Sequence, residues 1–239
     1  MVRQSAQTTR INVGSMIAVV GGDGSGKSTT VDNLTNWLST DFDTDCIHLG
    51  KPPWSWTTHV VRCGIMLCRK LRLYDEDRSA VDVAATNSTS VYPVLLRAVC
   101  KARDRYLTYV KARGKATTGT LVICDRFPVP QIRLMDGPNA ERIMVGRRAN
   151  HLTRFLTNLE KSFYEQIGAP DLLIVLRLDP ETAVRRKTED DAAAVRTRNE
   201  EIWRFDWRST CAYVIDAEQP QAKVLSTIKQ ILWQKLYTN

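Results

Sequence analysis

Met16-Ile17-Ala18-Val19-Val20-Gly21-Gly22-Asp23-Gly24-Ser25-Gly26-Lys27-Ser28-Thr29 is an apolar run that ends in a glycine-rich loop. The loop has the Walker A pattern: a glycine, four variable residues, Gly-Lys, and then Ser or Thr. The matching residues are Gly21, Gly26, Lys27 and Ser28. The apolar run predicts a buried strand, and the helical spacing of Val31, Leu34 and Leu38 predicts a helix after the loop. A strand, a loop and a helix in this order are the context in which the pattern binds phosphate.

The loop favours phosphate binding for a mechanical reason. Glycines permit positive φ angles, so successive backbone N–H groups can converge on an anion at the positive end of the next helix. Lys27 carries a point charge suited to the β- and γ-phosphates, and the Ser28 hydroxyl is placed to coordinate Mg²⁺. The alternative is a glycine-rich turn that binds nothing. We predict a nucleotide site formed by Gly21, Gly22, Asp23, Gly24, Ser25, Gly26, Lys27, Ser28 and Thr29.

Composition limits the classes of protein to consider. The chain has 239 residues, of which 43% are hydrophobic, which suits one α/β domain with a sizeable core. The formal charge of +8 favours anionic ligands. Since no nucleic-acid-binding motif of the usual kinds occurs, we expect nucleotides and no nucleic-acid partner.

The cysteines and the N-terminus indicate the compartment. The six cysteines form no C-x-x-C pair and no Cys/His zinc spacing, so they are expected to be reduced thiols. The N-terminus lacks the pattern of a signal peptide, and no stretch of about 18 uncharged apolar residues is present. We therefore expect a cytoplasmic protein without a transmembrane segment.

The remaining apolar runs predict the rest of the fold. Further strands are expected at 46–50, 121–125, 171–179 and 212–217, and helices at 54–73, 91–114, within 141–167, from Pro180 onward, and at 221–236. Strands that alternate with helices favour right-handed crossovers. The predicted fold is a three-layer α/β/α P-loop NTPase with a five-stranded, mostly parallel sheet. Residues 1–14 are predicted to be a flexible leader, followed by a single kinase domain at 15–239 with an insertion near 54–90.

The apolar positions of the helices predict their buried faces. The spacing of Val61, Ile65, Cys68 and Leu71 is helical. Inward positions are expected at Leu95, Val99, Tyr106 and Val110, and at Leu152, Phe155, Leu156, Leu159 and Phe163. The helix at 54–73 also carries several basic residues. It is expected to lie against the core or a partner subunit, which leaves a homodimer open. The alternative is a membrane surface. Residues 74–90 are predicted to be a mobile loop.

A strand that ends in a carboxylate supports the prediction from the Walker A loop. The apolar run at 121–125 ends in Asp125 and is followed at once by Arg126, as in a Walker B strand that delivers a carboxylate to Mg²⁺. Ser28 and Asp125 are therefore the predicted metal ligands, and Arg126 is expected to face the acceptor. The alternative is a strand that ends in a charged surface pair.

Basic residues in the last third of the chain predict a lid near 185–200. Arg185, Arg186, Lys187, Arg196 and Arg198 surround the acidic-to-small stretch at 189–194. Cations on both sides of a helical break suit a segment that closes on triphosphate charge.

With these pieces placed, most of residues 16–236 resembles the thymidylate kinase family. The resemblance is carried by the P-loop, by Asp125-Arg126-Phe127, by Ala102-Arg103-Asp104-Arg105, by residues 178–184 and by residues 214–217. The chain departs from the family at Gly50-Lys51-Pro52-Pro53-Trp54, where the family has an Arg-Glu-Pro-Gly-Gly loop. It also departs at residues 128–134, which lack the family's tyrosine.

The resemblance implies a division of roles. Lys27, Asp125, Arg126, Arg186, Arg196 and Arg198 would be catalytic, and Asp23, Arg105, Arg126 and Gln131 would bind the acceptor. The implied activity is transfer of the γ-phosphoryl group of Mg²⁺-ATP to a nucleoside monophosphate such as dTMP. Two alternatives stay open: a P-loop kinase acting on another small acceptor, and a nucleotide-binding regulatory protein with little catalysis.

Overall fold

The computed structural model describes residues 14–71 and 91–236. The leader predicted at 1–14, apart from Gly14, and the loop predicted at 74–90 lie outside these residues. The chain divides into two compact units. The first consists of Met1–Gly50, Tyr109–Asp136 and Ala169–Asn239, and the second of Lys51–Thr108 and Gly137–Gly168. Among the described helices, none is long and apolar enough to cross a membrane.

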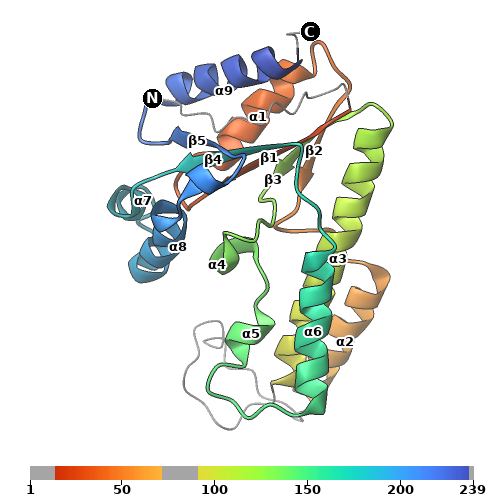
Figure 1. Cartoon of the computed structure of the whole chain (residues 1–239). Helices are drawn as coiled ribbons and strands as arrows, with labels where there is room; N and C mark the ends of the chain where they lie inside the picture. The colour runs from red at the N-terminus through yellow and green to blue at the C-terminus, as the bar shows by residue number, and fades with distance from the viewer. Residues whose placement is uncertain (1–13, 72–90, 237–239) are drawn as a thin grey trace. The chain divides into compact units, whose positions relative to one another are not determined.

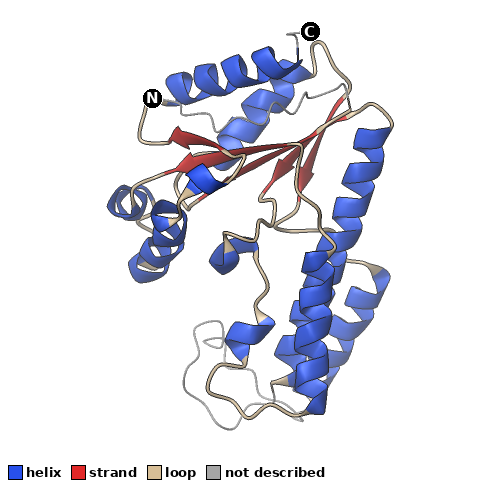
Figure 2. Ribbon diagram, in the orientation of Figure 1, coloured by secondary structure: helices blue, strands red, loops and turns tan. Residues whose placement is uncertain are grey.

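The first unit contains a five-stranded sheet (Figures 1 and 2). Its strands are β1 (Met16–Gly21), β2 (Thr44–His48), β3 (Leu121–Asp125), β4 (Leu172–Arg177) and β5 (Tyr213–Asp216). The strand order is β2-β3-β1-β4-β5, and all four pairings are parallel. The predicted α/β fold with a five-stranded sheet is therefore confirmed.

Helices cover both faces of this sheet, as in other buried parallel sheets. Figure 1 shows α1 (Lys27–Leu38) and α9 (Gln221–Leu236) on one side, and α7 (Pro180–Arg186) and α8 (Ala192–Arg204) on the other. Alternate strand residues such as Ile17, Ile123 and Ile174 share one hydrophobic cluster with Leu34 of α1 and Ile228 of α9. Every residue of β1 and β3 is buried, which explains their continuous apolar sequences.

The parallel arrangement brings functional positions to one edge of the sheet. β1 leads into the glycine-rich loop, and its neighbour β3 ends at Asp125, which is opposite Val19 in the β1–β3 register. The short helix α4 (Arg133–Asp136) follows the carboxyl end of β3. The 3-10 helix η2 (Trp207–Ser209) precedes β5. Ligands of α/β proteins usually bind at this edge.

The described residues of the second unit form helices and loops (Figure 2). The helices are α2 (Trp56–Lys70), the part of α3 (Tyr92–Thr117) up to Thr108, α5 (Ala140–Ile143) and α6 (His151–Glu165). Leu95, Val99, Ala140 and Leu156 form its core cluster. Asn150 begins α6 with a capping box, in which its side chain accepts from Thr153 N and Thr153 Oγ1 accepts from Asn150 N. The last turns of α3 belong to the first unit, where Arg113 pairs with Asp171 and Lys115 with Asp45.

Several predicted inward positions are wrong. The exposed fractions of Val110, Leu152 and Phe155 are 46%, 52% and 60%. Leu71, at 59%, and Cys68 are exposed on the helix that was expected to lie against the core or a partner subunit. In α6, the buried residues are Thr153, Leu156 and Glu160. Both polar members have a structural partner, because Thr153 belongs to the capping box and Glu160 accepts from backbone N–H groups of Asn139 and Ala140. Because these polar residues are buried, the buried face of α6 differs from the face that its hydrophobic residues predict.

Candidate functional site

The glycine-rich loop has the backbone geometry of an anion cradle. Gly24 and Gly26 have φ angles of 71° and 81°, in the left-handed region that favours glycine. Gly26 is the N-cap residue of α1, so the first-turn N–H groups of that helix face the loop without intrahelical acceptors. At Gly21, an added Cβ would lie 2.6 Å from the carbonyl oxygen of Leu176 on β4, so only glycine fits beside that strand.

Lys27 is held inside the loop. Its side chain is 6% exposed, and its Nζ donates to the carbonyl oxygen of Gly22. The same oxygen accepts from Ser25 Oγ at 2.8 Å. Burial, followed by the positive charge of Arg126, lowers the pKa of Lys27 to about 8. Ser28 and Thr29 are exposed on the first turn of α1, where their hydroxyls are accessible to a ligand.

Asp125 offers an unused acceptor beside the loop. It is 4% exposed at the end of β3, and its Oδ2 lies 3.5 Å from Nε2 of His48 on β2. Its Oδ1 is buried and has no hydrogen-bond partner among the described residues. A buried carboxylate oxygen without a donor is costly in the free protein, and an oxygen ligand of this type suits Mg²⁺. With the glycine cradle on the neighbouring strand, the residues present therefore fit a magnesium-bound polyphosphate.

Arg126 has an unusual backbone conformation. Its φ angle of 55° makes it the one non-glycine residue with positive φ among the described residues. Such strain persists where the surroundings hold the residue in place, and it is often found at functional sites. Here Gly50 provides the room, because a Cβ on Gly50 would lie 2.5 Å from Cδ of Arg126 and 2.9 Å from Cε1 of His48. The sequence analysis missed His48 and Gly50, since their role depends on the pairing of β2 with β3.

Two of the three lid arginines that were predicted to be catalytic contact the loop. Arg186 Nη1 donates to the carbonyl oxygens of Gly24 at 3.2 Å and Ala217 at 3.0 Å. Arg198 Nε donates to Asp23 Oδ2 at 2.6 Å. Arg196 instead forms a two-point pair with Glu181, at 2.6 and 3.0 Å. In this structure Arg186 and Arg198 therefore reach the phosphate loop, and Arg196 does not.

The predicted acceptor residues are divided between the two units. Asp23, Arg126 and Gln131 belong to the first unit, and Gln131 is half-buried between β3 and α4. Arg105 belongs to the second unit, where it is fully buried and donates to the hydroxyl of Tyr164 at 2.8 Å. The neighbouring Asp104 is 2% exposed, and neither carboxylate oxygen has a hydrogen-bond partner among the described residues. The sequence analysis included Asp104 only as part of a motif.

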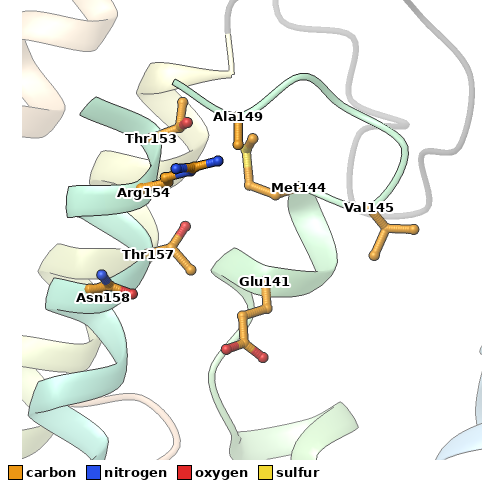
Figure 3. A pocket seen from close by; sticks show the side chains of 8 residues that line it. All are labelled: Glu141, Met144, Val145, Ala149, Thr153, Arg154, Thr157 and Asn158. Atoms are coloured by element: carbon orange, nitrogen blue, oxygen red, sulfur yellow. The ribbon is translucent and has the colours of Figure 1, made fainter. Parts of the chain in front are cut away.

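The second unit also contains an open pocket of about 370 Å³ between α5 and α6 (Figure 3). Its lining includes Glu141, Met144, Thr153, Arg154 and Asn158. None of the predicted site residues is among the residues that line it.

No family model matches the chain. The uncharacterized ATP-binding protein YghR of Escherichia coli K12 is 30% identical over 217 residues, which cover 88% of this chain and 83% of YghR. The uncharacterized ATP-binding protein YghS of the same strain is 27% identical over 221 residues, 88% of this chain and 89% of YghS. A solved thymidylate kinase from Ehrlichia chaffeensis is 17% identical with a TM-score of 0.49, covering 91% of this chain and 98% of that kinase.

Proposed function

Because the chain belongs to the family of the uncharacterized ATP-binding protein YghR, we propose that it binds Mg²⁺-ATP at residues 21–29 and transfers the γ-phosphoryl group to a small acceptor. One observation carries the proposal. Asp125 presents a buried oxygen that has no hydrogen-bond partner in the described part of the chain, at the end of the strand next to the glycine cradle that holds Lys27. Phosphoryl transfer depends mainly on positioning and charge, and this edge of the sheet supplies both.

The donor side uses the loop and its nearest strand. The N–H groups of the loop and of the first turn of α1 bind phosphate oxygens, and Lys27 exchanges the carbonyl oxygen of Gly22 for a phosphate oxygen. Ser28 and Asp125 would hold Mg²⁺, which neutralises charge on the donor phosphates. Arg186 and Arg198, at Gly24 and Asp23, add positive charge beside the group that moves.

The acceptor side uses residues that follow β3. Arg126, held against Gly50 in its strained conformation, orients the phosphate or hydroxyl of the acceptor. Asp23 and Gln131 are the further acceptor contacts that we propose in the first unit. The acceptor role that the resemblance implies for Arg105 stays a prediction. A nucleoside monophosphate such as dTMP is the first acceptor to test. Because residues 50–54 and 128–134 differ from the thymidylate kinase pattern, other nucleotides, nucleosides and sugars must be tested as acceptors as well.

An ADP-release assay tests the proposal. Wild-type protein with Mg²⁺ and ATP is assayed against nucleoside monophosphates, nucleosides and sugars, and we expect one class of acceptor to stimulate turnover. Arg126→Ala should lower that turnover by roughly 10- to 150-fold, since hydrogen bonds to charged groups contribute about 1.5–3 kcal/mol. Arg204→Ala, which removes an exposed arginine paired with Glu200, is the matched control and should have no effect.

Two results would overturn the proposal in different ways. Failure of the wild-type protein to bind ATP removes the donor site. Tight ATP binding without acceptor-stimulated turnover, together with no effect of Arg126→Ala, instead indicates a nucleotide-binding protein with little catalysis.

A further inference from the structure

Two consecutive residues of α8 lie against two consecutive residues of the phosphate loop. Arg198 donates to Asp23, as described above, and the next residue, Asn199, packs on Gly22. Asn199 is 1% exposed, and none of the motifs in the sequence includes it. An ionic or amide side chain in such a position is normally retained only where it has a partner.

The amide group of Asn199 is fixed by its own helix. Nδ2 donates to the carbonyl oxygen of Val195, one turn earlier, at 2.9 Å. Oδ1 is buried, has no hydrogen-bond partner among the described residues, and points at Gly22. The bond to Val195 and the complete burial leave the amide little freedom to swing aside.

Gly22 has no room for a side chain because of this amide. A Cβ built on Gly22 would lie 1.8 Å from Oδ1 and 2.5 Å from Cγ of Asn199. Unlike Gly24 and Gly26, Gly22 does not have a positive φ angle. Space rather than backbone conformation therefore requires glycine at this position.

The position of Gly22 in turn determines where Lys27 lies. The carbonyl oxygen of Gly22 accepts from Lys27 Nζ, from Ser25 Oγ and from the backbone N–H of Ser25. A shift of Gly22 would move this shared acceptor and the loop N–H groups around it. Errors of about 1 Å in such a site can reduce activity about 100-fold.

We propose that Asn199 is a positioning residue for phosphate binding. Its side chain packs against Gly22 and keeps the loop in the conformation that binds ATP. The proposal rests on the proposed function, because it assumes that the loop binds ATP. When Lys27 leaves Gly22 for a phosphate oxygen, the contact between Asn199 and Gly22 keeps the loop backbone in place.

A size-compensation experiment tests this. The wild-type protein, Gly22→Ala, Asn199→Ala and the double variant are titrated with ATP and Mg²⁺ by calorimetry, and the thermal unfolding of each is measured. Gly22→Ala should weaken ATP binding on the order of 100-fold. Asn199→Ala should weaken it by about tenfold, and the double variant should bind more tightly than Gly22→Ala because Cγ and Oδ1 are gone. Thr197→Ala, an exposed change on the same helix, is the control and should bind as the wild type does.

The outcomes separate this inference from the proposed function. If the wild type binds ATP but Gly22→Ala binds equally well, or the double variant is no better than Gly22→Ala, the positioning role is wrong. If Gly22→Ala does not fold, Asn199→Ala decides alone, and wild-type affinity in that variant overturns the role. If the wild type binds no ATP, the proposed function and the role in ATP binding fall together. The thermal data would then still show whether Asn199→Ala restores the stability lost in Gly22→Ala.

Discussion

The phosphate loop of the first unit supplies partners for its own charged groups. In contrast, two buried carboxylates outside the loop have oxygens without a hydrogen-bond partner among the described residues: one oxygen of Asp125 in the first unit and both oxygens of Asp104 in the second. Lys27 donates to Gly22, Arg186 to Gly24, and Arg198 to Asp23. In the second unit, both carboxylate oxygens of Asp104 are buried without a hydrogen-bond partner among the described residues. The loop is thus internally satisfied, and a polyphosphate must replace contacts that already exist. The carboxylate of Asp104 would break no existing hydrogen bond of its oxygens if it accepted one from another group.

Substitutions at the loop and at Asp104 should therefore change different measured properties. Changes at the loop should appear in ATP binding and turnover, because the loop residues exchange internal partners for phosphate oxygens. Changes at Asp104 should appear first in stability, because both of its buried carboxylate oxygens lack a hydrogen-bond partner among the described residues.

The largest effect is expected for Lys27→Ala. It removes the cation that we propose leaves the carbonyl oxygen of Gly22 for a phosphate oxygen, and it should cost about 2–4 kcal/mol of transition-state stabilisation, by analogy with the loss of one preorganised donor. That corresponds to a loss of roughly 30- to 900-fold in kcat/KM, measured by ADP release. Lys223→Ala, an exposed lysine on α9, is the matched control. An unchanged rate in Lys27→Ala would contradict the role of Lys27.

Gly50→Ala should affect the acceptor side and leave the donor side intact. Its Cβ would lie 2.5 Å from Cδ of Arg126, and such overpacking typically costs about 1–3 kcal/mol. We expect acceptor-stimulated turnover to fall about tenfold or more while the dissociation constant of Mg²⁺-ATP stays unchanged. The two quantities are measured by ADP release and by calorimetry.

The control for Gly50→Ala is Gly64→Ala on α2. Apart from the adjoining backbone of α2, no atom of the described residues lies within 4 Å of a Cβ at Gly64, so alanine should stabilise the helix by about 0.5–1 kcal/mol and leave turnover unchanged. Equal losses of ATP binding and turnover in Gly50→Ala would mean that the two sides of the site are not separable in this way.

Asp104→Asn sharpens the contrast from the second unit. Replacing the charge by a neutral amide of the same shape reduces the cost of burying an unpartnered group, so the free protein should become more stable by about 1–3 kcal/mol. Urea unfolding measures the gain. A loss of stability would show that the carboxylate has a favourable role in the free protein, and the loop and Asp104 would then not differ in the way described.

The parts of the fold that sequence predicts well are those encoded in one continuous stretch. The residues of β3 and α9 agree with the predicted ranges, because β3 is apolar throughout and α9 keeps helical spacing along its length. β2 lies at Thr44–His48, two residues before the predicted 46–50. It is an edge strand that pairs only with β3 and is not fully buried, so polar Thr44 and Asp45 are tolerated where the apolar pattern alone excluded them.

The parts that sequence could not predict are contacts between distant residues. The Walker A pattern identifies Lys27 and Ser28, but nothing local connects Asn199 to Gly22 or Arg198 to Asp23, which are 175 positions apart. Glu201 on the same helix accepts from the N–H groups of Arg133 and Leu134, in the segment that follows Arg126. One helix therefore contacts both the phosphate loop and the segment after β3, and only the folded structure reveals this.

The smallest effect is expected at Glu160, the buried carboxylate of the second unit that does have partners. It is 2% exposed and accepts from the N–H groups of Asn139 and Ala140, which lower its pKa, but burial outweighs them and the pKa is raised above its ordinary value near 4.5. The folded protein therefore holds this proton more tightly than the unfolded chain does. The stabilising contribution is fully present below pH 4.5 and is lost as the pH rises through the folded-state pKa.

Glu160→Gln removes this titration and keeps an oxygen that can accept from the two amides. Relative to this variant, the wild type should lose stability as the pH rises from about 4 to 7, by on the order of 1 kcal/mol or less because the amide donors oppose the effect of burial. Urea unfolding of both proteins across this range measures the difference. Parallel curves would show that Glu160 titrates equally in the folded and unfolded chains. Of the buried carboxylates Asp104 and Glu160, only Asp104 would then lower the stability of the folded protein. The two backbone amides that donate to Glu160 would be enough to explain why Glu160 does not.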